Sequence, residues 1–406
     1  MKRSRWQSMT AQSRFPCSCI RWIVLALAAV PLSAFPVTAV HALRDDEVLE
    51  VLPAVTRSRP ARLESAARLA DPALAALQAR QDIGLARQTG DTRHWGRAQA
   101  VLAPWWNRPD APADLAVLQA TVQQGRHEFD ASRAVLTAAL ARSPGHAQAW
   151  LNLAALERLS ARYTDALRAC EAVARAGQAL YATACRLETQ SLQGQHQSAV
   201  QGLRALANQA SDNKLRSWLL SLLAESEERS GSDSAAADSY RRSLALGFDL
   251  YTSIAYSDLL LRTGMASQAL QALSALPATD AVLLRRAAAW RRLGDSRWTG
   301  IRASLQERAA ELLRRGDDPA LHGRELALIA LWLDDDAPRA LALSRRNLLL
   351  QREPIDWWVA LQSARQANDA IAFGEIASAI HAAGLQDVRL ASTMRGIKHS
   401  ARKVTK

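Results

Sequence analysis

The sequence lacks the local patterns that usually mark an active site. It has no Gly-rich phosphate loop and no Gly-x-Ser-x-Gly segment, which are typical of nucleotide-binding loops and serine hydrolases. No two histidines form a His-x-x-x-His arrangement, and none lies beside a cysteine at metal-ligand spacing. We therefore expect no enzymatic activity, no cofactor and no metal site.

Residues that favour strands are also scarce. Phenylalanine and tyrosine number five each, and β-branched runs are rare, whereas the good helix formers Ala, Leu and Arg are abundant. A compact chain of 406 residues would divide into two or three domains. An array of repeats escapes that limit, because each unit contacts only its neighbours. The composition predicts an all-α protein.

The formal charge of +12 does not describe a basic surface. Five Lys or Arg residues lie in residues 1–42 and five in 391–406, with no acid in either segment, so the body between them carries only +2. Nucleic acid requires a sustained basic face, so we expect no nucleic-acid partner. We interpret 391–406 as a basic disordered tail that contacts anionic membrane surfaces only weakly.

Residues 1–42 resemble an export signal. A basic leader precedes the uncharged segment Trp22–Val40, and Val40-His41-Ala42 is similar to a small-residue cleavage site. This predicts a cleaved signal peptide and a periplasmic body. The alternative is an uncleaved inner-membrane anchor, because the uncharged segment is 19 residues long, close to the length that spans a bilayer. In both cases the body lies in the periplasm.

A small residue followed four positions later by a larger apolar one recurs about every 34 residues. The pairs are Ala98/Leu102, Ser132/Leu136, Ala166/Cys170, Ala199/Leu203, Ala236/Tyr240 and Ala269/Leu273. This period is typical of stacked helix–turn–helix units. Turn residues such as Gly90-Asp91 and Gly231-Ser232 separate the helices. We predict a right-handed superhelical α-solenoid of about nine antiparallel helix pairs over 73–390, after an N-terminal preface at 43–72.

Two copies of the unit resemble the tetratricopeptide repeat family. The better one reads Trp150-Leu151-Asn152-Leu153-Ala154 and then Ala166-Leu167-Arg168-Ala169-Cys170, and the other covers 220–224 and 236–240. The better copy matches the family's Trp-x-x-Leu-small opening and its Ala-x-x-x-large second helix. Glu157 and Glu227 depart from it, standing where the family usually has an aromatic residue. Residues 326–364 also look like uncharacterised exported bacterial repeat proteins.

The resemblance implies that the first helix of each unit lines a concave groove. Tyr181, Trp218 and Tyr251 then occupy equivalent positions in successive units, and seven residues further on come Glu188, Glu225 and Asp258. Aromatic faces beside carboxylates suit an extended segment that carries Arg or Lys. They would also suit sugar rings. The alternative is that the aromatics pack between helices while the acids are solvated.

Cys170 and Cys185 are the two cysteines that remain beyond residue 42. They lie seven residues before and eight residues after Gly177, a turn between two predicted helices, so an antiparallel arrangement places them opposite each other. An oxidising compartment would allow a disulfide. The alternative is that both are small buried residues at helix contacts.

The sequence thus predicts an exported, non-enzymatic scaffold or adaptor. It would bind a protein or extended peptide partner through the groove of a tetratricopeptide-like solenoid, in an envelope or secretion assembly. The alternative is a glycan-binding module that serves polysaccharide export or cell-wall remodelling.

Overall fold

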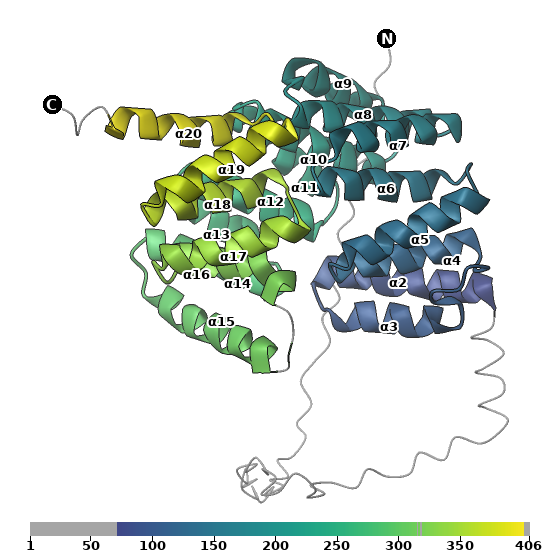
Figure 1. The fold of residues 1–406 in the computed structure, drawn as a ribbon, viewed down its shortest axis with the longest axis horizontal. Helices are drawn as coiled ribbons and strands as arrows, with labels where there is room; N and C mark the ends of the chain where they lie inside the picture. The colour runs from purple at the N-terminus through teal and green to yellow at the C-terminus, as the bar shows by residue number, and fades with distance from the viewer. Residues whose placement is uncertain (1–70, 315, 317–318, 402–406) are drawn as a thin grey trace, which may run out of the picture. The chain divides into compact units, whose positions relative to one another are not determined.

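The computed structural model describes residues 71–401 except 315, 317 and 318 (Figure 1). The predicted signal peptide at 1–42 and the preface up to residue 70 lie outside the described residues.

The described residues form nine consecutive helix pairs and one final helix. The first helices of the pairs are α2 (Pro72–Thr89), α4 (Ala113–Gly125), α6 (Ala147–Leu159), α8 (Ala179–Leu192), α10 (Asn213–Arg229), α12 (Leu250–Arg262), α14 (Asp280–Arg292), α16 (Gly323–Trp332) and α18 (Pro354–Gln366). Their second helices are α3 (Arg93–Leu102), α5 (Phe129–Arg142), α7 (Tyr163–Arg175), α9 (His196–Gln209), α11 (Asp233–Leu246), α13 (Ala266–Leu273), α15 (Arg297–Arg314), α17 (Ala337–Leu350) and α19 (Ala370–Ala383), and α20 (Val388–Ala401) follows. Each second helix contacts its own first helix and the first helix of the next pair. The predicted all-α solenoid of tetratricopeptide-like units is therefore confirmed.

The repeated small and large residues are the anchors of these pairs. All twelve are buried, and Ala166, Ala199, Ala236 and Ala269 have no exposed surface. A small side chain lets two helix backbones approach, while the larger residue one turn later fills the space beside it. The first pair begins as its sequence predicts, because Pro72 opens α2 and the Asp71 carboxylate accepts a hydrogen bond from the Ala73 N–H at 2.8 Å.

The anchor pattern changes in the seventh pair. Ala303 and Glu307 would continue the period in α15, but the helix instead buries Leu305 and packs Ile301, four residues earlier, against the core. Leu305 is the sole buried residue among those described in α15. The 34-residue anchor pattern is therefore weak in α15 because this helix has only a narrow apolar stripe.

The two glutamates that depart from the family pattern are buried and ion-paired. Glu157 on α6 accepts from the Arg133 Nε of α5 at 3.0 Å. Glu227 on α10 accepts from Arg204 of α9 at 2.7 Å and from the Ser239 hydroxyl of α11 at 2.6 Å. A buried carboxylate is tolerated only when it is paired in this way. Each one replaces an aromatic contact by a polar link to the helices beside it.

The C-terminal residues pack against the hairpin turns of the middle pairs (Figure 1). The Arg352 N–H donates to the Leu159 carbonyl at 2.7 Å, and the Gln386 N–H donates to the Leu192 carbonyl at 2.8 Å. Arg389 of α20 forms an ion pair with Glu228 of α10 at 2.8 Å. Arg352 immediately precedes Glu353 and Pro354, so its contact places the start of α18 beside the end of α6, while the residues around the start of α20 lie beside the ends of α8 and α10.

The prediction of a disordered tail at 391–406 is wrong for residues 391–401, which are helical. From Ala391 to Ala401 the chain continues α20, and residues 402–406 lie outside the described residues. Leu390 and Thr393 are buried, and Met394 packs on the same apolar cluster as Leu390. These contacts give α20 a docked apolar side in spite of its basic composition. None of the described helices is long and apolar enough to cross a bilayer.

Candidate functional site

The three predicted aromatics lie near the starts of α8, α10 and α12. Tyr181 and Trp218 are 38% and 37% exposed, and their ring centroids are 5.7 Å apart at an interplanar angle of 39°. Tyr251 is 56% exposed, and its hydroxyl is hydrogen-bonded to Glu225. The row therefore consists of one aromatic pair and a third ring that is tied to a carboxylate.

Two of the three predicted acids are held by arginines of neighbouring pairs. Glu188 on α8 binds Arg158 of α6 at 2.9 Å. Asp258 on α12 accepts two hydrogen bonds from Arg285 of α14, at 2.9 and 2.8 Å. A bidentate Arg–carboxylate pair is among the stronger polar contacts in proteins. These acids therefore join successive first helices.

Glu225 is bound less tightly. Its nearest cation is Arg229, one turn along the same helix, at 3.4 Å. Burial is the largest cause that raises the pKa of Glu225 to about 7; the carboxylates of Glu188 and Glu353 contribute to the rise, while Arg229 and the Tyr251 hydroxyl oppose it. This acid consequently exchanges its proton near neutral pH.

Glu188, Glu225 and Tyr251 line one cavity of about 240 Å³. Its walls also include Arg158 and Arg229, together with Glu353 and Pro354 from the start of α18. Asp258 lies on a different cavity of about 640 Å³, together with Arg262, Trp332 and Trp358. The structure thus brings two of the predicted acids together and separates the third.

Sequence reasoning missed the other polar groups of the 240 Å³ cavity. Tyr163 at the start of α7 and Gln124 on α4 both line it. They do not share the 34-residue period of the predicted row, and Glu353 comes from a pair more than a hundred residues later. The local pattern at Glu353-Pro354, a capping box with Asp356, predicts the start of a helix. It does not predict which other helices lie beside that start in the fold. Across the described ranges, no three His, Cys, Asp or Glu side chains are placed to hold a metal ion.

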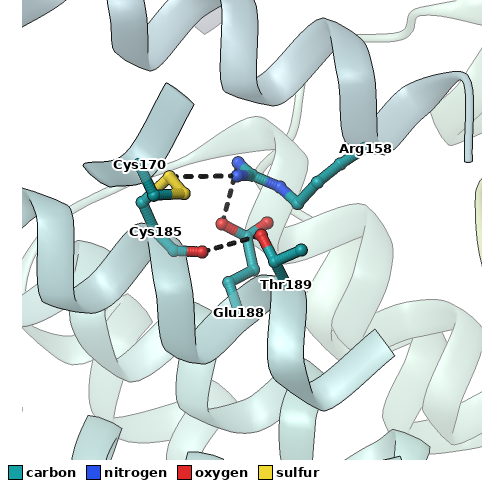
Figure 2. The surroundings of a disulfide bond; sticks show 5 residues. All are labelled: Arg158, Cys170, Cys185, Glu188 and Thr189. Carbon is teal, nitrogen blue, oxygen red and sulfur yellow. Dashed lines mark hydrogen bonds and ion pairs between the residues drawn. A yellow bond between two sulfur atoms is a disulfide. The ribbon is translucent and has the colours of Figure 1, made fainter. Parts of the chain in front are cut away.

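A disulfide lies beside this cavity (Figure 2). Cys170 of α7 and Cys185 of α8 are bonded, with their Cα atoms 5.6 Å apart. Arg158 lies between the disulfide and Glu188: its Nη1 is 3.5 Å from the Cys185 Sγ and its Nη2 is 2.9 Å from the Glu188 Oε2. The Thr189 hydroxyl donates to the Cys185 carbonyl at 2.8 Å. The bond therefore fixes α7 to α8 next to the wall formed by Arg158 and Glu188.

No protein-family model and no curated protein sequence matches the chain. Several solved structures are similar to it, including the following three. A tetratricopeptide repeat protein from Parabacteroides merdae is 11% identical with a TM-score of 0.37, and the match covers 62% of this chain and 98% of that one. The APC/C hetero-tetramer Cut9-Hcn1 is 12% identical with a TM-score of 0.38, covering 79% and 51%. The TPR domain of P58(IPK) is 14% identical with a TM-score of 0.20, covering 72% and 99%. The fold assignment rests on the chain's own helix pairs and their buried anchors.

Proposed function

We propose that this chain is an exported, non-enzymatic scaffold that binds an extended segment of a protein partner along α8, α10 and α12. The observation that carries the proposal is the contact between Tyr181 and Trp218, two large rings that remain more than one third exposed. Aromatic residues are enriched at protein interfaces, and Trp and Tyr are frequent among the few residues whose truncation costs most of the binding free energy. Neighbouring residues such as Leu219 and Ala182 are buried, so the two rings form a distinct surface feature of these helices.

The partner segment is expected to be basic. Glu225 lies close to Tyr251, and its ion pair with Arg229 is longer, at 3.4 Å, than those that hold Glu188 and Asp258. A guanidinium or ammonium group placed here would gain both an ion pair and a cation–π contact.

Two features support export of the scaffold. The basic leader and the uncharged segment in residues 1–42 have the organisation of a signal peptide. The disulfide adds a second argument, because such bonds persist in oxidising compartments and are rare in the cytosol. A periplasmic role in an envelope or secretion assembly agrees with both.

A glycan-binding module is the second candidate, and the same exposed ring pair favours it. Sugar rings would stack on Tyr181 and Trp218 without needing the charge of Glu225. The two functions therefore differ in their dependence on this carboxylate.

The test is site-specific photocrosslinking in cells that produce the protein. A photoreactive amino acid replaces Trp218, and a matched control places it at Ile371 on α19, which is 78% exposed. We expect a discrete protein adduct from position 218 that is absent from position 371 and is lost when Tyr181→Ala or Glu225→Gln is added. An adduct with polysaccharide alone, unaffected by Glu225→Gln, would favour the glycan module. Identical adducts from both positions, or none from position 218, would refute binding at this surface.

A further inference from the structure

The cavity of about 240 Å³ contains polar groups that have no protein partner. Tyr163 is 3% exposed, and its hydroxyl has no hydrogen-bond partner among the described residues. The same holds for the Gln124 Nε2, and rotation of that amide would present its Oε1 instead. A buried polar group left unsatisfied destabilises the free protein, so two of them at one cavity point to an occupant.

The charges around the cavity favour a cation. Glu188 is held by Arg158, and Glu225 has Arg229. Glu353 shares a third arginine, Arg324, with the fully buried Asp356, which takes two of that guanidinium's hydrogen bonds. When all of these groups are charged, the carboxylates exceed the guanidiniums by one, so above about pH 7, where Glu225 is ionised, an anion would meet a negative site.

The size of the cavity restricts what can enter. At about 240 Å³ it lies below the ~300–1,000 Å³ that sites for drug-sized ligands occupy. Tyr251, one of its lining residues, is 56% exposed and lies at the start of α12, in the pair after α10, which carries Trp218. A single side chain that projects from a segment bound along these helices meets both conditions.

We propose that this cavity binds one basic side chain of the partner segment, with the Glu225 carboxylate and the Tyr163 hydroxyl as acceptors for its N–H groups. The inference rests on the proposed function, since it names the residue type that the bound segment must carry. Glu225 forms the ion pair, and the remaining N–H groups of a guanidinium satisfy the tyrosine oxygen.

Protonation must be linked to this binding. The charged or titratable groups around Glu225 are Arg158, Tyr163, Glu188, Arg229, Tyr240, Tyr251 and Glu353. In the free protein Glu225 has a pKa of about 7, and a bound cation favours its ionised form. Binding therefore releases a proton, and affinity rises with pH, by about tenfold between pH 6 and pH 8.

The experiment is calorimetric titration of the full-length protein with two small probes. N-acetyl-arginine amide carries the guanidinium, and N-acetyl-citrulline amide is its neutral isostere. We expect the arginine probe to bind at least tenfold more tightly, with more proton release in buffers below pH 7. Equal binding of the two probes, no binding of either, or binding that is independent of pH would overturn the proposal.

Three variants assign the effect to residues. Glu225→Gln should weaken the arginine probe and remove its pH dependence, while Tyr163→Phe should weaken it several-fold and keep the pH dependence. Glu171→Gln removes the same charge from an exposed site on α7 and should change neither. Tyr163→Phe also deletes an unsatisfied buried hydroxyl, so its free energy of unfolding should not be lower than that of the parent. Weaker binding with an unchanged free energy of unfolding would separate the ligand role of the hydroxyl from a structural one.

The result is independent of the crosslinking test. If the arginine probe fails to bind while the adduct from position 218 forms, the cavity inference is wrong and the scaffold function stands. If the probe binds and no adduct forms at position 218, the cavity takes a free cation rather than a side chain of a bound segment. That result would contradict both the cavity inference and the scaffold function.

Discussion

Replacing Glu225 with glutamine should stabilise the free protein at neutral and alkaline pH. The folded protein raises the pKa of this acid from an ordinary 4.5 to about 7, with burial as the largest cause. A raised pKa means that the folded state binds the proton more tightly than the unfolded state does. Between these two pKa values the free energy of unfolding therefore falls as pH rises, and above pH 7 the full penalty for the buried charge is present.

The magnitude follows from the size of the shift. Each unit of pKa corresponds to ~1.4 kcal/mol, so a rise from 4.5 to about 7 is worth about 3 kcal/mol at pH 8. The side chain is only 17% exposed, so solvent screening removes little of this. Glutamine keeps the shape of the protonated acid and never ionises, so it avoids the penalty at every pH. The expected gain grows from under about 1 kcal/mol at pH 5 to about 3 kcal/mol at pH 8.

The assay is urea unfolding followed by circular dichroism at pH 5, 6, 7 and 8. Parent and Glu225→Gln are compared with Glu171→Gln, whose carboxylate is exposed on α7 and should give the parent's curve. A stability difference that does not change with pH would refute the reasoning. So would a variant less stable than the parent at pH 8, because the ionised acid would then be stabilising.

Three further predictions concern the helix pairs. Reduction of the disulfide, which joins residues 15 positions apart, should lower the free energy of unfolding by about 3 kcal/mol, measured by urea unfolding with and without dithiothreitol; equal curves would contradict it. Gly125→Ala should lower the free energy of unfolding by about 1–3 kcal/mol, because a Cβ there would clash with the Trp95 ring. Gly96→Ala is the control: no atom lies within 4 Å of its Cβ position, so thermal melts should show a neutral or stabilising effect. Ala236→Leu should lose ~1–3 kcal/mol at a position with no exposed surface, and a loss below about 0.5 kcal/mol would show that the contact is loosely packed.

The helix pairs were predictable because each unit carries its own local signals. The anchors Ala166/Cys170 and Ala236/Tyr240 lie four residues apart on one helix face, and this spacing can be recognised without any knowledge of the neighbouring unit. The turn at Gly90 is equally local: its φ of 66° is a conformation that glycine adopts at no steric cost. Stacking then follows, since a lone pair of helices cannot bury both apolar faces.

The C-terminal end could not be predicted by the same route. Its basic residues indicate a solvated tail when they are counted, but the fold depends on where they lie. Within the predicted tail, Thr393 is buried and Met394 packs on the apolar cluster of Leu390, while Arg389, just before the tail, forms an ion pair with Glu228 of the fifth pair. A charge total gives no information about which acid a basic residue meets.

The candidate site shows a similar division between local and distant information. A row of acids at one repeat position suggests free carboxylates, but in a solenoid an arginine of the adjacent unit can reach the same row. Glu188 meets Arg158 and Asp258 meets Arg285, in each case across a unit boundary that the repeat register does not describe. Glu225 differs because its nearest cation lies one turn away on its own helix, at a longer distance. The sequence does not reveal this difference, because Asp258 also has an arginine four residues later, Arg262, and yet pairs with Arg285. Only the fold shows which arginine each acid meets.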